Sequence, residues 1–184
     1  MSQLTELNWS PRPAASPAVG PRMPNRATVV TVSTSAAGGT ASDESGPLLQ
    51  GLLEGIGFTD IKVVVIADDK GAIERVLREE ISAGTSLVIT TGGTGLSRDD
   101  VTPEATSAVL DRVAPGFSEA IRAESIRQVP TGVLTRGVSG SAGSTLIINL
   151  PGRPKAVEES FAVIAKALPH AVEQLRGPGG RDRH

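Results

Sequence analysis

Acidic side chains lie beside a glycine-rich segment in a pattern that suits phosphate chemistry. The segment TTGGTGLSRDDVTPEA (residues 90–105) follows an apolar run, contains three glycines and includes Asp99 and Asp100. Glycines let the backbone approach a ligand closely, and successive N–H groups in such a turn can bind an anion. Because carboxylates repel phosphate, an acidic neighbour is useful mainly when Mg²⁺ lies between them. The pattern predicts a phosphate site with Asp100 as a magnesium ligand.

A second acidic position, Asp68 in IADDKG, follows another apolar run and could supply a second oxygen ligand. A simpler interpretation of Asp68 and Asp69 is a solvated turn between a strand and a helix. Asp99 could merely favour the dipole of the next helix, with Thr102 as its N-cap and Pro103 as its first residue. The glycines alone are compatible with a tight turn that binds nothing. The residue types leave these alternatives open.

Standard nucleotide-binding motifs are absent from this segment. After Gly93-Thr94-Gly95 a GxGxxG motif needs a glycine where Arg98 stands, and no lysine and hydroxyl follow as in a P-loop. A NAD dehydrogenase and a P-loop NTPase are therefore disfavoured. The chain has no cysteine, which excludes a thiol nucleophile and a cysteine-based metal site. His170 and His184 are isolated and suggest no metal cluster.

Length and charge limit the class of protein. A chain of 184 residues with a formal charge of -2 favours one domain and gives no electrostatic footprint for nucleic acid. We find no apolar run that could span a bilayer and no secretory signal, so we expect a cytoplasmic protein with no membrane partner. The proline-rich residues 1–26 predict a flexible leader, 27–176 the folded domain and 177–184 a flexible tail.

The folded domain alternates apolar β-branched runs with helical spacing. Strands are predicted at 27–34, 61–67, 86–91 and 144–150, the last preceded by a Gly-Ser-rich hairpin connection. Helices are predicted at 46–57, 70–84, 103–114, 115–126 and 153–175, the last with a kink at Pro169. This order predicts a three-layer α/β/α sandwich with a mostly parallel sheet. Ligands in such folds bind beyond the carboxyl ends of the strands, where the acidic and glycine-rich loops should meet.

Taken together, three motifs resemble one family. VITTGGTGLSRDDVTPEAT, SDESGP and VPTGVLTRGVSGSAGSTLIINLPGRPKAV, in their order, closely resemble the molybdenum cofactor biosynthesis proteins of the Mog/MoaB type, over about Thr28 to Gly177. The resemblance implies an α/β/α fold, a homotrimer and binding of molybdopterin. Mog-type members transfer AMP from Mg-ATP to molybdopterin and release pyrophosphate. Other molybdenum cofactor biosynthesis proteins are then candidate partners.

The resemblance also assigns residues. The two essential aspartates of the family correspond to Asp68 and Asp100, as catalytic residues and Mg²⁺ ligands. The substrate-binding positions it implies are Ser33, Gly92, Gly93, Thr94, Gly95, Thr102, Glu104, Thr135, Arg136, Pro151 and Gly152.

This chain departs from the family at three positions. Thr135 replaces a serine, Thr34 an aspartate after the first strand, and Asp99 a residue that is commonly basic. Two alternatives to an adenylyltransferase remain: a MoaB-like module that binds molybdopterin with little or no transfer activity, and a structural trimer that binds neither ligand.

Overall fold

The computed structural model describes residues 25–177. Nearly all of the predicted leader and tail lies outside this range. Within it the sheet has six strands in the order β2-β1-β3-β6-β5-β4. Their bounds are β1 Arg26–Val32, β2 Asp60–Ile66, β3 Leu87–Thr91, β4 Arg112–Val113, β5 Ser139–Ala142 and β6 Thr145–Leu150. Strands β2, β1, β3 and β6 are parallel, while β5 pairs antiparallel with β6 and β4 antiparallel with β5, so the predicted mostly parallel sheet is confirmed.

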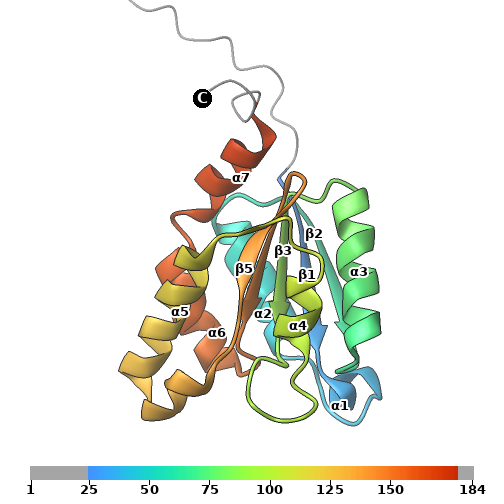
Figure 1. Ribbon diagram of the computed structural model, residues 1–184, viewed down its shortest axis with the longest axis vertical. Coiled ribbons are helices and arrows are strands. Elements are labelled where there is room, and N and C mark those ends of the chain that lie inside the picture. The colour runs from blue at the N-terminus through green and yellow to red at the C-terminus, as the bar shows by residue number, and fades with distance from the viewer. Residues whose placement is uncertain (1–24, 178–184) are drawn as a thin grey trace, which may run out of the picture.

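Helices cover both faces of the sheet (Figure 1). Their bounds are α1 Thr34–Ala37, α2 Ser45–Gly55, α3 Lys70–Ser82, α4 Thr102–Ser107, α5 Pro115–Gln128, α6 Pro154–Ile164 and α7 Leu168–Arg176, with a 3-10 helix, η1, at Pro130–Leu134. None of the helices within residues 25–177 is long and apolar enough to cross a membrane.

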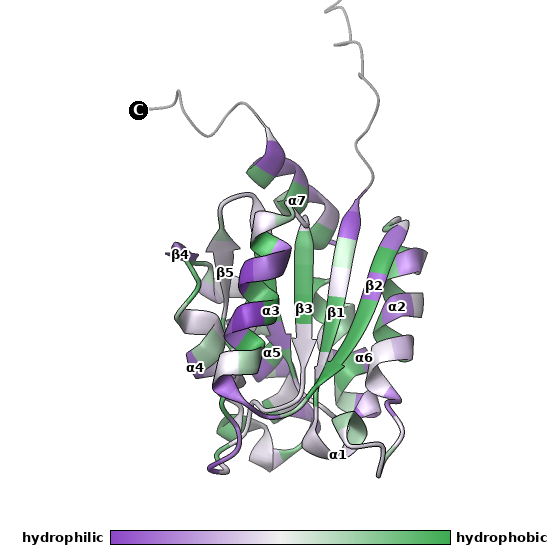
Figure 2. Ribbon diagram, turned by 90° about the vertical axis from the view of Figure 1, so that its right-hand side faces the viewer, coloured by the Kyte–Doolittle hydropathy of each residue, from purple (hydrophilic) through white to green (hydrophobic). Residues whose placement is uncertain are grey.

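Two apolar cores separate the three layers. One core packs α2, α5, α6 and α7 against one face of the sheet, through side chains such as Leu53, Ile121 and Phe161. The other packs α3 and α4 against the opposite face, through side chains such as Ile73 and Ala105. Figure 2 shows the central strands as largely hydrophobic and α3 in front of them with a hydrophilic outer surface. Both faces of the central strands are buried, which confirms the predicted sandwich.

The helix predicted over 103–114 is wrong in its second half. Helix α4 ends at Ser107, and Arg112 and Val113 instead form β4 on the edge of the β5–β6 hairpin. The N–H of Asp111 donates to the carbonyl of Ser141 at 2.9 Å, which starts this pairing. Pro115 also disfavours helical backbone at the residue before it. The pattern of apolar spacing could not reveal that a strand edge was open nearby.

The long helix predicted over 153–175 is two helices. Helix α6 ends at Ile164, and Pro169 lies in the first turn of α7 rather than at a kink. Proline has no N–H to donate to the carbonyl of Ala165, and its ring would crowd that carbonyl in a continuous helix. The helix therefore stops one turn before the proline and restarts around it.

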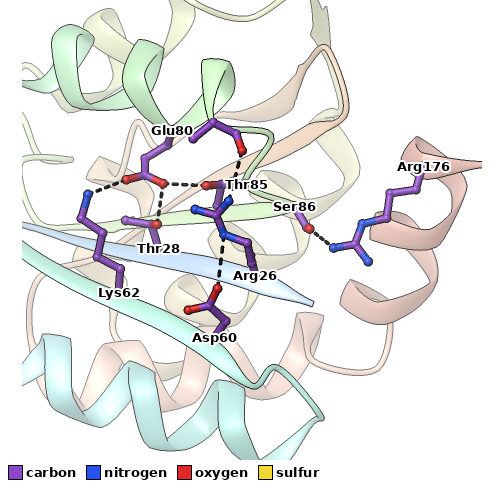
Figure 3. Close-up of polar contacts among 9 residues, drawn as sticks. Arg26, Thr28, Asp60, Lys62, Glu80, Thr85, Ser86 and Arg176 are labelled. Atoms are coloured by element: carbon purple, nitrogen blue, oxygen red, sulfur yellow. Dashed lines mark hydrogen bonds and ion pairs between the residues drawn. The ribbon is translucent and has the colours of Figure 1, made fainter. Parts of the chain in front are cut away.

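A buried carboxylate closes the amino-terminal end of the sheet (Figure 3). Glu80 of α3 accepts hydrogen bonds from the hydroxyls of Thr28 at 2.8 Å and Thr85 at 2.6 Å, and from the ammonium of Lys62 at 2.8 Å. Burial raises the pKa of Glu80, but these donors outweigh it and leave the pKa below the ordinary value. The Glu80 carboxylate is therefore fully paired at this end of the sheet.

Candidate active site

The glycine loop after β3 lies where three strands end. Gly92 has φ +101° and Gly93 has φ +61°, a region that favours glycine. A Cβ at Gly92 would lie 2.3 Å from the carbonyl oxygen of Val32, at the end of β1. A Cβ at Gly152, in the loop after β6, would lie 3.1 Å from the Cα of Gly92. Side chains at these positions would separate the three loops, so the glycines allow them to meet.

Asp68 approaches this loop from the end of β2. Its Oδ2 accepts hydrogen bonds from the backbone N–H of Thr34 at 2.7 Å and from the Thr34 hydroxyl at 2.9 Å. Its Oδ1 lies 3.3 Å from the place where a Cβ of Gly93 would stand. Thr34, one of the departures from the family, therefore orients this carboxylate. Sequence reasoning missed that role because nothing local to Thr34 signals it.

Asp100 approaches the same loop from the other side. Its Oδ2 accepts a hydrogen bond from the N–H of Ser97 at 2.8 Å and lies 2.8 Å from the place where a Cβ of Gly95 would stand. Asp99 is exposed. Asp68 and Asp100 thus flank one short stretch of backbone, Gly93 to Gly95.

The two carboxylates fit a hard cation such as Mg²⁺. In each, the protein hydrogen bonds within residues 25–177 go to Oδ2, and Oδ1 receives none. Mg²⁺ prefers oxygen ligands and is usually held by one or two carboxylates together with substrate phosphates. Among the described residues no group of three acidic or histidine side chains is placed to hold a metal alone. A cation here would need additional oxygens, as a nucleotide phosphate supplies.

Thr102 faces Gly93 with an unsatisfied hydroxyl. A Cβ at Gly93 would lie 2.4 Å from Thr102 Oγ1, and this buried oxygen has no hydrogen-bond partner within the described range. The predicted N-cap role of Thr102 is wrong, because α4 begins at Thr102 and no side chain caps it. An unpaired buried hydroxyl costs free energy. Thr94, also buried, lies in the same loop.

Arg136 and Glu104 pair with each other at the rim of the loop. One Nη of Arg136 makes a short hydrogen bond to the Glu104 carboxylate. This hydrogen bond lowers the pKa of Glu104 below its ordinary value. Thr135 precedes Arg136, and its carbonyl accepts from Arg122 Nε at 3.1 Å. The structure brings Arg136 and Glu104 to the glycine loop, and Thr135 is connected to it only as the chain neighbour of Arg136.

Ser33 and Gly152 border a small hollow beside the glycines, and Pro151 precedes Gly152 in the chain. Ser33 is the N-cap of α1, accepting from the N–H of Ala36 at 3.3 Å. The carbonyl of Pro151 accepts from the Thr91 hydroxyl at 2.8 Å. The hollow has a volume of ≈ 220 Å³ and is lined in part by Ser33 and Gly152. Pockets that enclose small ligands usually exceed ~300 Å³, so a nucleotide or pterin would lie partly outside it.

Asp43 is a residue of this hollow that the sequence prediction omitted. Its Oδ2 accepts from the Thr31 hydroxyl at 2.9 Å, and its Oδ1 from the N–H of Gly46 at 2.9 Å. A Cβ at Gly46 would lie 2.2 Å from Asp43 Oδ2. The SDESGP motif contained the signal: an aspartate three residues before a glycine at a helix start. Asp43 fixes the entry into α2 at the edge of the site.

Comparisons with known proteins identify relatives of this chain. The family described as "Probable molybdopterin binding domain" matches residues 28–170. Molybdenum cofactor synthesis protein cinnamon of Drosophila melanogaster is 43% identical over 150 residues, which make up 80% of this chain but only 25% of that protein. Molybdopterin adenylyltransferase of Haemophilus influenzae is 43% identical over 164 residues, covering 81% of this chain and 83% of that protein.

A solved structure gives the same relationship. The Mog protein of Mycobacterium ulcerans is 44% identical and superimposes with a TM-score of 0.79, over 82% of this chain and 99% of that one. Sequence and fold therefore agree, and the chain belongs to the Mog/MoaB type of the probable molybdopterin binding domain family.

Proposed function

We propose that this protein is a molybdopterin adenylyltransferase, which transfers AMP from Mg-ATP to molybdopterin in molybdenum cofactor biosynthesis. The observation that carries the proposal is the placement of Asp68 and Asp100 on either side of Gly93–Gly95, each with one oxygen free of protein hydrogen bonds. The relative from Haemophilus influenzae carries this name and is matched over most of both chains.

The reaction is a displacement at phosphorus. An oxygen of the terminal phosphate of molybdopterin attacks the α-phosphorus of ATP, the bond to the bridging oxygen of the β-phosphate breaks, and that oxygen leaves with pyrophosphate. Mg²⁺, held by Asp68 and Asp100, would neutralise charge on the phosphates. The chain's own contribution is mainly positioning and charge stabilisation.

The loops divide this work. The N–H groups of the glycine loop bind phosphate oxygens without a Cβ in the way. Thr34 keeps Asp68 turned toward Gly93, and the Ser97 N–H keeps Asp100 turned toward Gly95. We propose that the unpaired Thr102 hydroxyl donates to a phosphate when the loop moves slightly. The phosphate would then supply the hydrogen-bond partner that this buried hydroxyl lacks. Ser33, Thr94, Thr135, Pro151 and Gly152 complete the proposed substrate contacts.

A coupled assay with molybdopterin, ATP and Mg²⁺ tests the proposal by measuring pyrophosphate and adenylyl-molybdopterin together. We expect both products in equal amounts. Molybdopterin binding without either product would support the MoaB-like alternative, and binding of neither ligand would support a structural role. Isothermal titration with each ligand separates these two outcomes.

We further propose a homotrimer located in the cytoplasm. The trimer follows from the family resemblance, and apolar side chains exposed on α5, η1 and α6 support an interface: Ile126 at 46%, Val133 at 61% and Val163 at 45% exposure. The cytoplasmic location suits a reaction that consumes ATP.

A further inference from the structure

We propose that Arg136 is a positioning residue that latches the glycine loop and Asp100 in place, rather than a ligand of the substrate phosphate. The proposal rests on the proposed function for its activity test, whereas its structural test does not. Arg136 lies in the segment between η1 and β5, and it makes four hydrogen bonds, three to the loop and one to helix α4.

The four bonds span the loop from end to end. The backbone N–H of Arg136 donates to the carbonyl of Thr94 at 2.9 Å. Its Nε donates to the carbonyl of Gly95 at 2.6 Å, and one Nη donates to the carbonyl of Asp100 at 2.6 Å. The other Nη bonds to the carboxylate of Glu104, in the first turn of α4. One side chain therefore connects the glycines, the aspartate and the next helix.

The base of this latch is itself fixed. Arg122 of α5 donates to the carbonyls on both sides of Arg136, to Thr135 at 3.1 Å and to Gly137 at 3.2 Å. The side-chain oxygen of buried Asn149 accepts from the N–H of Val138 at 3.1 Å. The backbone of Arg136 is thus held from α5 and from β6. It can transmit that rigidity to the loop.

The loop has little else to hold it. The side chains from Leu96 to Asp99 are exposed, and Leu96 is 65% exposed. The remaining bonds within this stretch join Ser97 to Asp100, which closes a local turn without attaching it to the sheet. The N-terminus of α4 lacks a side-chain cap. Beyond this stretch, the backbone N–H of Thr102 donates to the carbonyl of Gly93 at 3.1 Å, so the position of Asp100 relative to Gly93 depends on this bond together with Arg136.

The geometry of the guanidinium separates a latch from a phosphate ligand. A planar fork can reach three acceptors at once, while a lysine ammonium is a point charge on a flexible stem. If Arg136 bound phosphate by charge, Arg136→Lys should retain much of the activity that Arg136→Gln loses. If Arg136 is a latch, lysine and glutamine should fail alike.

Amide hydrogen exchange in the ligand-free protein tests the latch directly. In Arg136→Lys we expect the N–H groups of Ser97, Asp100 and Thr102 to exchange on the order of tenfold faster, because the loop opens more often. The N–H of Gly92, which donates to the carbonyl of Leu150 beside the sheet, should be unchanged. Arg98→Lys is a matched control, since Arg98 is on the same loop and its side chain makes no bond within residues 25–177. Unchanged exchange in Arg136→Lys would overturn the proposal.

Activity provides the second readout. We expect kcat for adenylyl transfer to fall on the order of tenfold or more, and equally, in Arg136→Lys and Arg136→Gln. Rescue by lysine would overturn the latch. If either variant fails to fold, Glu104→Ala can be used instead, because it removes one of the four acceptors of Arg136. Hydrogen exchange at the same amides should then be faster than in wild type but slower than in Arg136→Lys, and unchanged exchange would count against the latch. A wild-type protein without transferase activity would refute the proposed function. The hydrogen-exchange result would then still decide whether Arg136 holds the loop.

Discussion

The aspartates in and around the site differ in their hydrogen-bond partners. Asp43 engages both oxygens, and Asp69 accepts from the N–H of Ala72 as the N-cap of α3. Within residues 25–177, Asp68 and Asp100 each accept hydrogen bonds at Oδ2 alone, and both carboxylates lie beside a glycine of the loop. Asp69 therefore has a role in the turn before α3, while the metal-ligand role of Asp68 stays a prediction.

Replacing Asp100 by asparagine tests the charge requirement. Asparagine keeps the size and one acceptor but removes the charge that a hard cation needs, so we expect adenylyl transfer to fall on the order of 100-fold. Circular dichroism and the melting temperature should remain near wild type. Asp99→Asn is the control, because loss of a charge near a helix start costs only ~0.3 to 1 kcal/mol of stability and should spare turnover. Near-normal transfer by Asp100→Asn at saturating Mg²⁺ and ATP would remove the metal-ligand role.

The variant Gly93→Ala tests whether the loop must pass close to Thr102. Positive φ alone costs an alanine about 1 to 2 kcal/mol of folding free energy. At Gly93 the new Cβ would also collide with Thr102 Oγ1, so we expect about 1 to 3 kcal/mol more destabilisation, together with weaker ATP binding. Gly84→Ala isolates the first effect, since Gly84 has φ +67° and a Cβ there would have nothing within 4 Å. Equal losses in the two variants, measured by urea unfolding, would show that the collision is unimportant.

Among the elements, α3 combines an exposed outer face with one buried charge. Glu80 is 3% exposed, yet it is fully hydrogen-bonded across β1, β2 and the start of β3. A buried charge with partners is stable in place, whereas removing it leaves those partners unpaired.

Glu80→Gln should therefore lower the free energy of unfolding by about 1 to 3 kcal/mol near neutral pH. The pKa of Glu80 in the folded protein lies below its ordinary value of 4.5. Its contribution is thus present above 4.5 and is lost as the pH falls through the folded-state pKa. We expect the difference between wild type and variant to shrink on acidification, measured by urea unfolding at fixed protein concentration. A difference independent of pH would argue that the carboxylate charge contributes nothing.

Local patterns predicted the central strands and the convergence of their loops, because burial on both faces leaves long apolar runs in the sequence. The same patterns failed at Arg112–Val113 and at residues 165–167, where a neighbouring strand edge and a missing N–H decide the structure. Asp68 and Asp100 were identified from spacing and family resemblance together. The roles of Thr34 and Arg122 depend on contacts between distant segments, and no local pattern encodes them. For Asp43 the SDESGP motif carried a local signal that the sequence prediction did not use.

At the scale of the whole molecule, the exposed apolar side chains of α5, η1 and α6 predict self-association. We expect light scattering at micromolar concentration to give three times the chain mass of 18.9 kDa. Val133→Glu and Val163→Glu should each shift the mass downward, because a charge in an apolar interface loses its solvation. Arg75→Glu on the outer surface of α3 is the matched control and should leave the mass unchanged. A monomer in the wild type would refute the trimer.

The two ends of the described chain lie together, at the end of the sheet opposite the site. Arg176 of α7 donates a hydrogen bond to the side chain of Asn25 at 2.8 Å, while α1 and the glycine loop lie at the far end (Figure 1). A unit whose ends are adjacent can be inserted into a longer polypeptide without stretching its host, and it tolerates circular permutation. Linking residue 176 to residue 26 through a short glycine spacer, with new ends at the exposed Gly143-Ser144 turn, should give a protein that still folds. Fusion partners joined directly to residue 25 or residue 177 would leave the entrance to the phosphate loop clear.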